Sequence, residues 1–385
     1  MAGIYIHIPF CKQACYYCNF HFSTSLNLED EMITALIKEI KLSSFSLLND
    51  KSEKEIIETI YFGGGTPSLL TNDDITSLLD AIKNNYAISE EAEVTIEANP
   101  DDISKEKLSG WKEAAINRLS IGIQSFKEKD LQWMNRVHNT SQAFESISLA
   151  KYAGFNNFSV DLIYGTPGLT DEEWKLNVEQ VINSGAPHIA CYALTVETNT
   201  ALQKMIALKK KVDIDTDQQA RQFLLLMKWL KEAGYEHYEI SNFAKPDYRS
   251  RHNSSYWQGK KYIGIGPSAH SYDGESRRWN VANNTLYIQS IKNNIILFEE
   301  EKLTDVERLN EYIMTSLRTI EGLDLKLIEN NFSIKQRKRI ENAIVDDINK
   351  KMIIYTNEKL VLTDEGKLFA DGIASQLFML SETSH

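Results

Sequence analysis

Short apolar runs alternate with longer amphipathic segments along the first two thirds of this 385-residue chain. The short runs are rich in β-branched and aromatic residues, which predicts strands at Gly3–Ile8, Thr59–Phe62, Glu93–Ala98, Arg118–Ile123, Phe158–Ile163, Ile189–Leu194 and His237–Ile240. The longer segments repeat apolar residues at helical spacing, which predicts helices at Asp30–Leu42, Asp73–Asn84, Ser141–Tyr152, Glu172–Asn183 and Gln218–Ala233. This alternation is typical of βα units in a parallel sheet, so we predict an α/β fold with a barrel or partial barrel.

Many of the predicted strands end in polar residues or glycines. The carboxyl ends of the strands of a parallel barrel meet at one rim, and binding sites are usually built there. We therefore expect a site that includes Gly63–Thr66, Glu97, Gln124, Asp161 and Tyr164–Thr166.

The pattern becomes mainly helical from about Asn283. Two helical segments precede short strands at Ile353–Tyr355 and Lys359–Leu362, an order that predicts a small winged-helix-like domain. This segment carries no clear basic recognition face, so we interpret it as a lid or docking domain. We predict three regions: a barrel domain at residues 1–245, a connecting region at 246–300 and a helical domain at 301–385.

The charge and composition of the chain bear on its binding partners and its location. The chain carries a net charge of −12 and has no long basic run, so it lacks the attraction to phosphate backbones on which nucleic-acid binding depends. Its first ten residues lack a basic start, and no later stretch reaches the length of a membrane span. We expect a cytoplasmic protein with no nucleic-acid partner and no membrane span.

Three of the four cysteines lie within eight positions, as Cys11-Lys-Gln-Ala-Cys15-Tyr-Tyr-Cys18, directly after the first predicted strand. This spacing indicates a metal site in a reducing compartment. Three thiolates on a four-iron cubane leave one iron free to chelate the amine and carboxylate of a methionyl group. The alternative is zinc held by the three cysteines with His7 or His21, but zinc ligands usually come as separated pairs.

A CxxxCxxC motif with an aromatic residue, here Tyr17, before its last cysteine resembles the signature of the radical SAM superfamily. Members cleave S-adenosylmethionine (SAM) to a 5′-deoxyadenosyl radical inside a partial (β/α)6 barrel. The resemblance implies a [4Fe-4S] cluster on Cys11, Cys15 and Cys18, SAM on the fourth iron, and an electron donor such as a flavodoxin or ferredoxin. It also implies SAM contacts from Tyr5, Tyr17, Gly64, Gly65, Thr66, Glu97, Gln124, Arg136 and Asp161.

The order of motifs along nearly the whole chain resembles the branch that contains oxygen-independent coproporphyrinogen III oxidase and, within it, the HemW-type heme chaperones. Phe20 stands where the oxidase has a further cysteine, and Cys11 lies almost at the start, without the extension that precedes the oxidase cluster. Both departures argue against the oxidase activity. The missing cysteine and the string HNSSYW, residues 252–257, favour a carrier that binds heme and passes it to an unidentified acceptor protein. Oxidative decarboxylation of porphyrinogen propionates stays the alternative, and no catalytic residue is assigned.

The string HNSSYW, residues 252–257, resembles the HemW-type motif. Imidazole is the ordinary axial ligand of heme iron, so we predict His252 as a heme ligand, with His270 and Cys191 in reserve. The alternative is a structural turn with a hydrogen-bonded histidine. Lys245–Arg278 contains seven cations and three acids, and we expect these cations to pair with heme propionates unless they belong to a solvated loop.

The segment Gly264–Ala269 fits the loose dinucleotide pattern GxGxxA. Pro267 and the lack of a following βαβ unit deny it the helix N-terminus that a pyrophosphate needs, so we reject NAD binding. The sequence leaves open the heme acceptor, covalent attachment of heme, the use of radical chemistry and the oligomeric state.

Overall fold

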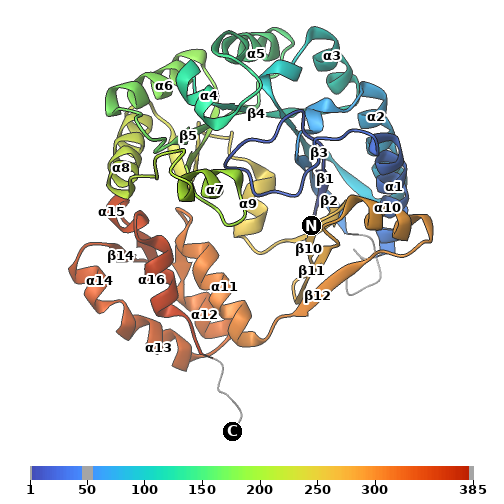
Figure 1. Ribbon diagram of the computed structural model, residues 1–385. Coiled ribbons are helices and arrows are strands. Elements are labelled where there is room, and N and C mark those ends of the chain that lie inside the picture. Colours follow the sequence, from blue (N-terminus) through green and yellow to red (C-terminus); the bar gives the residue numbers. More distant parts are fainter. Residues whose placement is uncertain (1, 46–54, 381–385) are drawn as a thin grey trace.

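The computed structural model describes residues 2–45 and 55–380, and its largest feature is a curled, mixed sheet (Figure 1). The order of its strands is β12-β11-β10-β9-β1-β2-β3-β4-β5-β6-β8-β7. Their bounds are β1 Ala2–Ile8, β2 Ile56–Gly64, β3 Ala87–Ala98, β4 Arg118–Gln124, β5 Phe158–Tyr164, β6 His188–Ala193, β7 Glu236–Glu239, β8 Asn242–Ala244, β9 Lys261–Ile265, β10 His270–Tyr272, β11 Ser276–Asn280 and β12 Phe298–Lys302.

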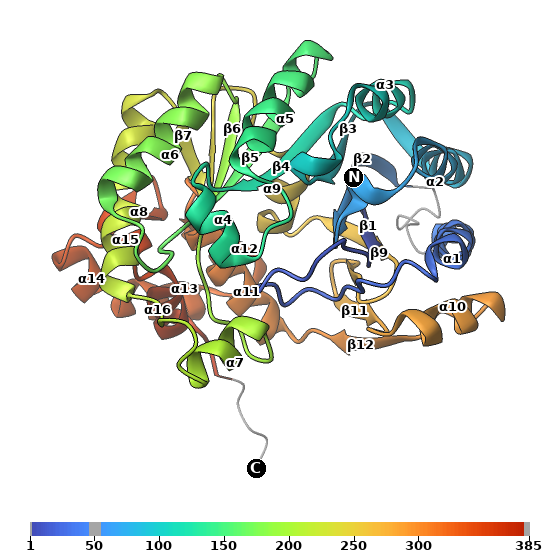
Figure 2. The same cartoon turned by 45° about the horizontal axis from the view of Figure 1, so that its top comes forward.

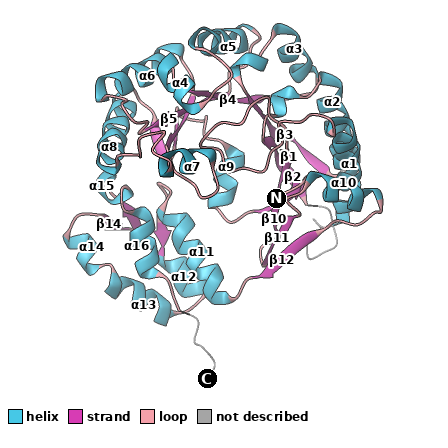
Figure 3. Ribbon diagram, in the orientation of Figure 1, coloured by secondary structure: helices cyan, strands magenta, loops and turns pink. Residues whose placement is uncertain are grey.

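Six strands, β1 to β6, pair in parallel with their neighbours in chain order. Helices cover the outer face of this half of the sheet (Figure 3). Their bounds are α1 Glu29–Leu42, α2 Asn72–Asn85, α3 Lys105–Glu113, α4 Glu128–Met134, α5 Thr140–Tyr152, α6 Asp171–Ser184 and α8 Thr216–Glu232. The predicted α/β fold with a partial (β/α)6 barrel is confirmed, while α3 and α4 were not predicted.

The last strand of the series runs in the predicted direction but has an unpredicted neighbour. The strand at His237–Ile240 was expected in the parallel series, and β7 does run parallel to β6. It does not pair with β6, because β8, which was not predicted, lies between the two strands and is antiparallel to both. Only Ile240 and Ser241 separate β7 from β8, and a connection this short permits only an antiparallel pair.

Residues 246–300 extend the sheet on its other side. Strand β9 lies parallel to β1, and β10, β11 and β12 continue from it in antiparallel order. The glycines of the GxGxxA string permit this close packing, because a Cβ on Gly266, which has φ of 107°, would lie 2.6 Å from the His7 carbonyl oxygen. This region also holds α9 Arg251–Trp257 and α10 Asn284–Lys292.

The C-terminal segment forms its own apolar core below the barrel (Figure 2). It contains α11 Asp305–Leu317, β13 Leu323–Asp324, α12 Leu325–Asn331, α13 Ile334–Ala343, α14 Val345–Asn349, β14 Ile353–Thr356, β15 Lys359–Leu362, α15 Asp364–Lys367 and α16 Ala370–Leu377. The predicted order of helices followed by a hairpin is present. Within residues 2–45 and 55–380, no helix combines the length and the apolar character that a membrane crossing requires.

A buried carboxylate ties the first helix to the β9–β11 side of the sheet. Glu39 of α1 accepts hydrogen bonds from Gly266 N and Asn280 Nδ2, each at 2.7 Å, and from the Tyr287 hydroxyl. Burial nevertheless raises the pKa of Glu39 to about 7, because a desolvated carboxylate is unfavourable even with three donors.

This carboxylate should make stability depend on pH. Its pKa is about 7 in the folded chain and lower in the unfolded chain, so folding takes up a proton between these values. The contribution of Glu39 to the free energy of unfolding should therefore fall as the pH rises towards 7. In Glu39→Gln this part of the pH dependence should vanish, so the variant should lose about 2–3 kcal/mol less stability than the parent between pH 4 and pH 8. Urea unfolding at several pH values measures this difference, and identical pH profiles would contradict the assignment.

Candidate functional site

A cavity of about 700 Å³ runs through the barrel from the cysteine loop to α9. One end is lined by Cys11, Cys15, Tyr17 and Cys18, and the other includes Asn253 of α9. Helix α7, Ala201–Ala207, lies at the cysteine end, opposite α9 (Figures 1 and 2). Most of the predicted rim residues line this cavity: Gly64, Gly65, Thr66, Glu97, Gln124, Arg136, Asp161 and Tyr164. Gly63, Gly165 and Thr166 lie outside its lining.

The cysteine loop is held in place by its backbone. Cys11 N donates to Ser23 O at 3.0 Å, and Tyr16 N donates to Met134 O at 3.2 Å. The Tyr16 carbonyl in turn accepts from Leu202 N of α7 at 2.8 Å. These contacts come from the segment before α1, from α4 and from α7, so the last two bring distant parts of the chain to the cluster motif.

The three thiols are free, and those of Cys11 and Cys15 meet polar groups of the rim. The Thr66 hydroxyl lies 3.4 Å from Cys11 Sγ, and Arg136 Nη1 lies 3.5 Å from Cys15 Sγ. Burial raises the pKa of Cys11, and it raises the pKa of Cys18 to about 11. A bound metal reverses this preference, because coordinated thiols are deprotonated outright.

The donor set fits a cluster. In the described ranges, no three His, Cys, Asp or Glu side chains surround a position for a single metal ion. A cubane binds each thiolate through a different iron, so its ligands need not converge on one point. Three thiols from one loop, facing a common cavity with a nearby guanidinium, match this requirement. When bound, such a cluster would supply the electron for cleavage of SAM.

The histidines of the zinc alternative are engaged elsewhere. His7 Nε2 lies 2.8 Å from the His21 carbonyl oxygen, and His7 Nδ1 lies 3.2 Å from the Tyr5 hydroxyl. His21 Nε2 lies 2.7 Å from Asn284 Oδ1. Both rings therefore serve to join β1, the cysteine loop and α10, which leaves the iron–sulfur interpretation as the better fit.

The glycines after β2 are required by packing as well as by the cavity. A Cβ on Gly65 would lie 2.5 Å from Phe10 O, and Gly65 N donates to Ile8 O at 2.9 Å. Gly64 has φ of 102°, and a Cβ there would lie 2.5 Å from the His7 ring. The sequence reasoning expected these glycines to admit a ligand. The structure adds that they admit the backbone of the cysteine loop.

Two buried carboxylates face the middle of the cavity. Burial raises the pKa of Glu97 to about 7 and also raises the pKa of Asp161. Glu97 accepts a 2.8 Å hydrogen bond from the Tyr61 hydroxyl, and Asp161 accepts from the hydroxyls of Ser159 and Ser120. These partners hold both carboxylates in place, with directed acceptors for the amine and hydroxyl groups of a polar ligand.

Of the other residues predicted to bind SAM, Gln124, Arg136 and Tyr17 line the cavity, and Tyr5 does not. Gln124 ends β4 with φ of 66°, an unusual backbone for a residue other than glycine. Arg136 Nη2 donates to Asn99 Oδ1 at 2.6 Å, and Tyr17 lines the cavity. Tyr5 lies outside the cavity lining, where its ring stacks on Tyr61 with 6.2 Å between centroids.

His252 is buried beneath the cavity, with 1% of its surface exposed. Its Nδ1 lies 2.8 Å from Thr59 Oγ1, its Nε2 lies 2.9 Å from the Tyr256 hydroxyl, and its ring stacks on Tyr61. Burial lowers the pKa of His252 to about 3, so the ring is neutral at physiological pH. The HNSSYW motif that contains His252 lies in helix α9, whereas the alternative considered from the sequence was a structural turn.

The other two candidates for the heme ligand, His270 and Cys191, lie on strands β10 and β6. His270 is exposed on β10, beside the ring of Trp279. Cys191 is buried in β6, and burial raises the pKa of its thiol well above the ordinary value.

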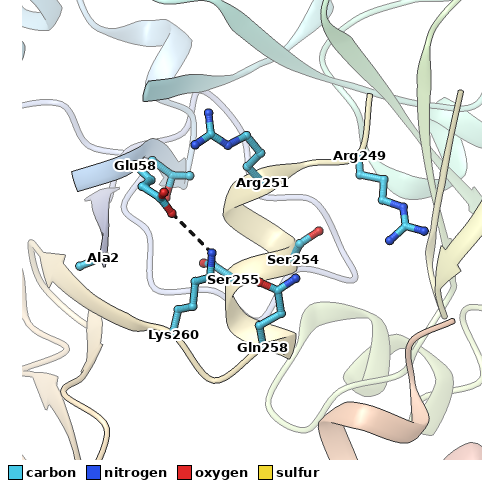
Figure 4. Close-up of a pocket in the computed structure, with 9 residues that line it drawn as sticks. Ala2, Glu58, Arg249, Arg251, Ser254, Ser255, Gln258 and Lys260 are labelled. Carbon is cyan, nitrogen blue, oxygen red and sulfur yellow. Dashed lines mark hydrogen bonds and ion pairs between the residues drawn. The ribbon is translucent and has the colours of Figure 1, made fainter. Parts of the chain in front are cut away.

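The expected surplus of positive charge in Lys245–Arg278 is reduced by acids from distant segments. Arg249 pairs with Glu236 at 2.8 Å and with Glu321 at 2.7 Å, and Arg277 pairs with Glu311 at 2.8 Å. A second cavity of about 240 Å³ lies against α9, and there Lys260 contacts Glu58 at 3.4 Å (Figure 4). Figure 4 also shows Arg249 directed away from this ion pair. A count of charges within residues 245–278 could not reveal these acids, because all of them lie outside that segment.

Sequence reasoning missed several cavity residues, including Tyr61, Asn99, Arg118, His188 and Tyr192. One signal was available in β4, where Arg118, Ser120, Gly122 and Gln124 occupy alternate positions. Alternate residues of a strand point to the same face, so a polar alternation in a buried strand indicates a polar interior.

Comparisons with known proteins agree with this geometry. Residues 5–181 match the family model described as "Radical SAM superfamily", and residues 303–369 match "HemN C-terminal domain". A curated protein named heme chaperone HemW from Mycobacterium tuberculosis is 32% identical over 97% of this chain and 94% of its own length. A protein of the same name from Bacillus subtilis is 33% identical over 97% of this chain and 98% of its own.

Among solved structures, coproporphyrinogen III oxidase from Escherichia coli, described as a radical SAM enzyme, superposes with a TM-score of 0.84. The match covers 98% of this chain and 90% of the oxidase, at 23% sequence identity. At this level of identity the likeness establishes the fold, including the placement of the C-terminal segment.

The cysteine loop makes a direct prediction about metal content. Anaerobic reconstitution should load about four irons per chain, because three thiolates and SAM complete a cubane. Replacing Cys11, Cys15 or Cys18 by Ala should abolish iron binding, while Cys191→Ala, a matched control in buried β6, should retain it. Iron and sulfide analysis with visible spectroscopy measures this, and zinc uptake without iron would contradict it.

A second prediction concerns the buried carboxylates. Glu97→Ala or Asp161→Ala should weaken SAM binding by about 1–3 kcal/mol, or roughly 5- to 150-fold, because each removes a directed acceptor. Glu172→Ala, an exposed position on α6, serves as the control. Isothermal titration of the reconstituted protein gives the affinities, and unchanged values in both cavity variants would show that SAM lies elsewhere.

Proposed function

Because this chain belongs to the HemW family of the radical SAM superfamily, we propose that it is a heme chaperone, which binds heme and transfers it to an acceptor protein. One observation carries the proposal: relatives named heme chaperone match over nearly the whole chain, including the region that contains HNSSYW. The SAM-ligated cluster at the other end of the barrel would support assembly or transfer.

We further propose His252 as the axial ligand of heme. Its neutral ring is ready to coordinate iron, and Thr59 at Nδ1 orients it as outer partners commonly orient metal-binding histidines. Ligation through Nε2 requires the contact with Tyr256 to break. Since His252 is almost fully buried, α9 must also move when heme binds.

The cellular location and the partners of the protein are part of the same proposal. We place the protein in the cytoplasm, where cysteines remain reduced, and we expect an electron donor such as a flavodoxin or ferredoxin. We expect no nucleic-acid partner, because the net charge of −12 opposes binding to phosphate backbones.

A radical enzyme that acts on a tetrapyrrole is the second candidate. The observation that favours it is the gathering of the predicted SAM residues around one cavity. Release of carbon dioxide from coproporphyrinogen III by the reconstituted protein would support this second candidate. A stable heme complex without such release supports the chaperone.

The ligand assignment can be tested directly. His252→Ala should shift or abolish the heme absorption bands and raise the dissociation constant, because a methyl group cannot replace an imidazole–iron bond. Tyr256→Phe is the matched variant, since it frees Nε2 and keeps the ligand, and it should bind heme at least as tightly as the parent. His270→Ala and Cys191→Ala should leave the spectrum unchanged. A parent-like spectrum in His252→Ala would contradict the assignment, and a parent that binds no heme would contradict the chaperone proposal.

A further inference from the structure

We infer that Arg118 anchors a carboxylate-binding subsite in the part of the main cavity nearest α9, and that it receives a propionate of a tetrapyrrole. The inference that the ligand is a tetrapyrrole rests on the proposed function. The existence of an anion subsite rests on the geometry of Arg118 alone.

Arg118 is a buried cation that lines a cavity. It is the first residue of β4, and 1% of its surface is exposed. Its Nε and Nη2 atoms have no hydrogen-bond acceptor in the part of the chain that the structure describes. Buried N–H groups normally have a partner, so two unpaired donors on one guanidinium indicate that a ligand supplies the acceptors.

The nearest acid does not satisfy these donors. Glu93 Oε2 lies 3.9 Å from Arg118 Nε, which is longer than a hydrogen bond. The Glu93 carboxylate instead accepts from the backbone N–H groups of Arg251 at 3.1 Å and His252 at 3.0 Å, where α9 begins. Arg118 therefore has a charge partner without a hydrogen-bond partner.

Two other polar side chains near Arg118, Asp161 and His188, already have partners. Asp161 accepts hydrogen bonds from Ser120 and Ser159. His188 Nδ1 contacts Ser159, and His188 Nε2 lies 2.8 Å from the Tyr238 hydroxyl. A movement of these side chains towards Arg118 would break existing contacts, whereas a ligand carboxylate would complete the site without doing so.

A second guanidinium reaches the same cavity from the C-terminal segment. Arg318, at the end of α11, pairs through Nη1 with Asp371, and its Nε has no acceptor among the described residues. Guanidinium groups bind carboxylates through paired N–H donors. Two such groups suit a ligand with two carboxylates, which is the chemistry of a porphyrin with two propionates.

The walls near this end suit a flat, largely apolar ligand. Tyr61, which stacks on His252 of α9, lines the cavity with Tyr192 and Ile240. Aromatic and aliphatic faces pack against a porphyrin plane, while cations bind its acidic edge. The methionyl carboxylate of SAM is the other possible source of an anion. We assign it to the opposite end, beside the three cysteines.

The experiment compares metal-free protoporphyrin IX with its dimethyl ester, so that iron ligation plays no part. Fluorescence titration of the SAM-loaded parent should show a preference for the diacid of about tenfold or more, because only the diacid offers charged acceptors. Arg118→Gln should remove most of this preference, and Arg118→Lys should retain part of it. Arg221→Gln, which alters an exposed ion pair on α8, is the control and should behave as the parent. SAM affinity should stay the same in all variants.

Several results of this experiment would overturn the inference. Equal affinity of the parent for diacid and diester would do so, even if Arg118→Gln cannot fold, and so would a full preference in Arg118→Gln. A loss of SAM affinity with porphyrin binding unchanged would assign the subsite to SAM. If the parent binds heme without preferring the diacid, only this inference fails. If it binds neither heme nor porphyrin, the proposed function fails as well.

Discussion

The inward side chains of the parallel strands determine what this barrel can do. A strand sends alternate residues to opposite faces, so β3, β4 and β5 present one set of residues to the helices and another to the interior. The helix-facing set is apolar, whereas the inward set includes Glu97, Arg118 and Asp161. Charged groups placed in an interior of low polarity bind tightly to whatever pairs with them, and they are unfavourable when unpaired.

This constraint explains why the polar residues of the interior come in supported groups. Tyr61 holds Glu97, two serines hold Asp161, and Asn99 holds Arg136. Arg118 is the member whose donors lack this support. Burial makes the ionised form of Glu97 less favourable, which raises its pKa to about 7. Ligand groups that pair with the carboxylate would reduce this cost.

The sequence predicted the local parts of this arrangement well and the long-range parts poorly. The strand–helix alternation, the cysteine motif and the strand-end residues are set within a few positions of one another, and the fold and the cavity lining agree with them. The division into three regions and the heme role of His252 stay predictions. Strand β8 was missed because it is only three residues long and follows β7 after a two-residue turn, and the partners of Arg249 were missed because Glu321 lies far along the chain.

Helix α9 connects the two halves of the chemistry. Its first two backbone N–H groups bind Glu93, which is the nearest acid to Arg118, and its histidine packs against Tyr61, which holds Glu97. A movement of α9 that frees His252 would therefore release the Glu93 carboxylate and disturb the support of Glu97, a residue predicted to bind SAM. Binding at one end of the cavity would then alter affinity at the other, and linkage requires the effect to be reciprocal. Since α9 also contacts the C-terminal segment through Trp257 and Arg318, that segment is placed to sense the same movement.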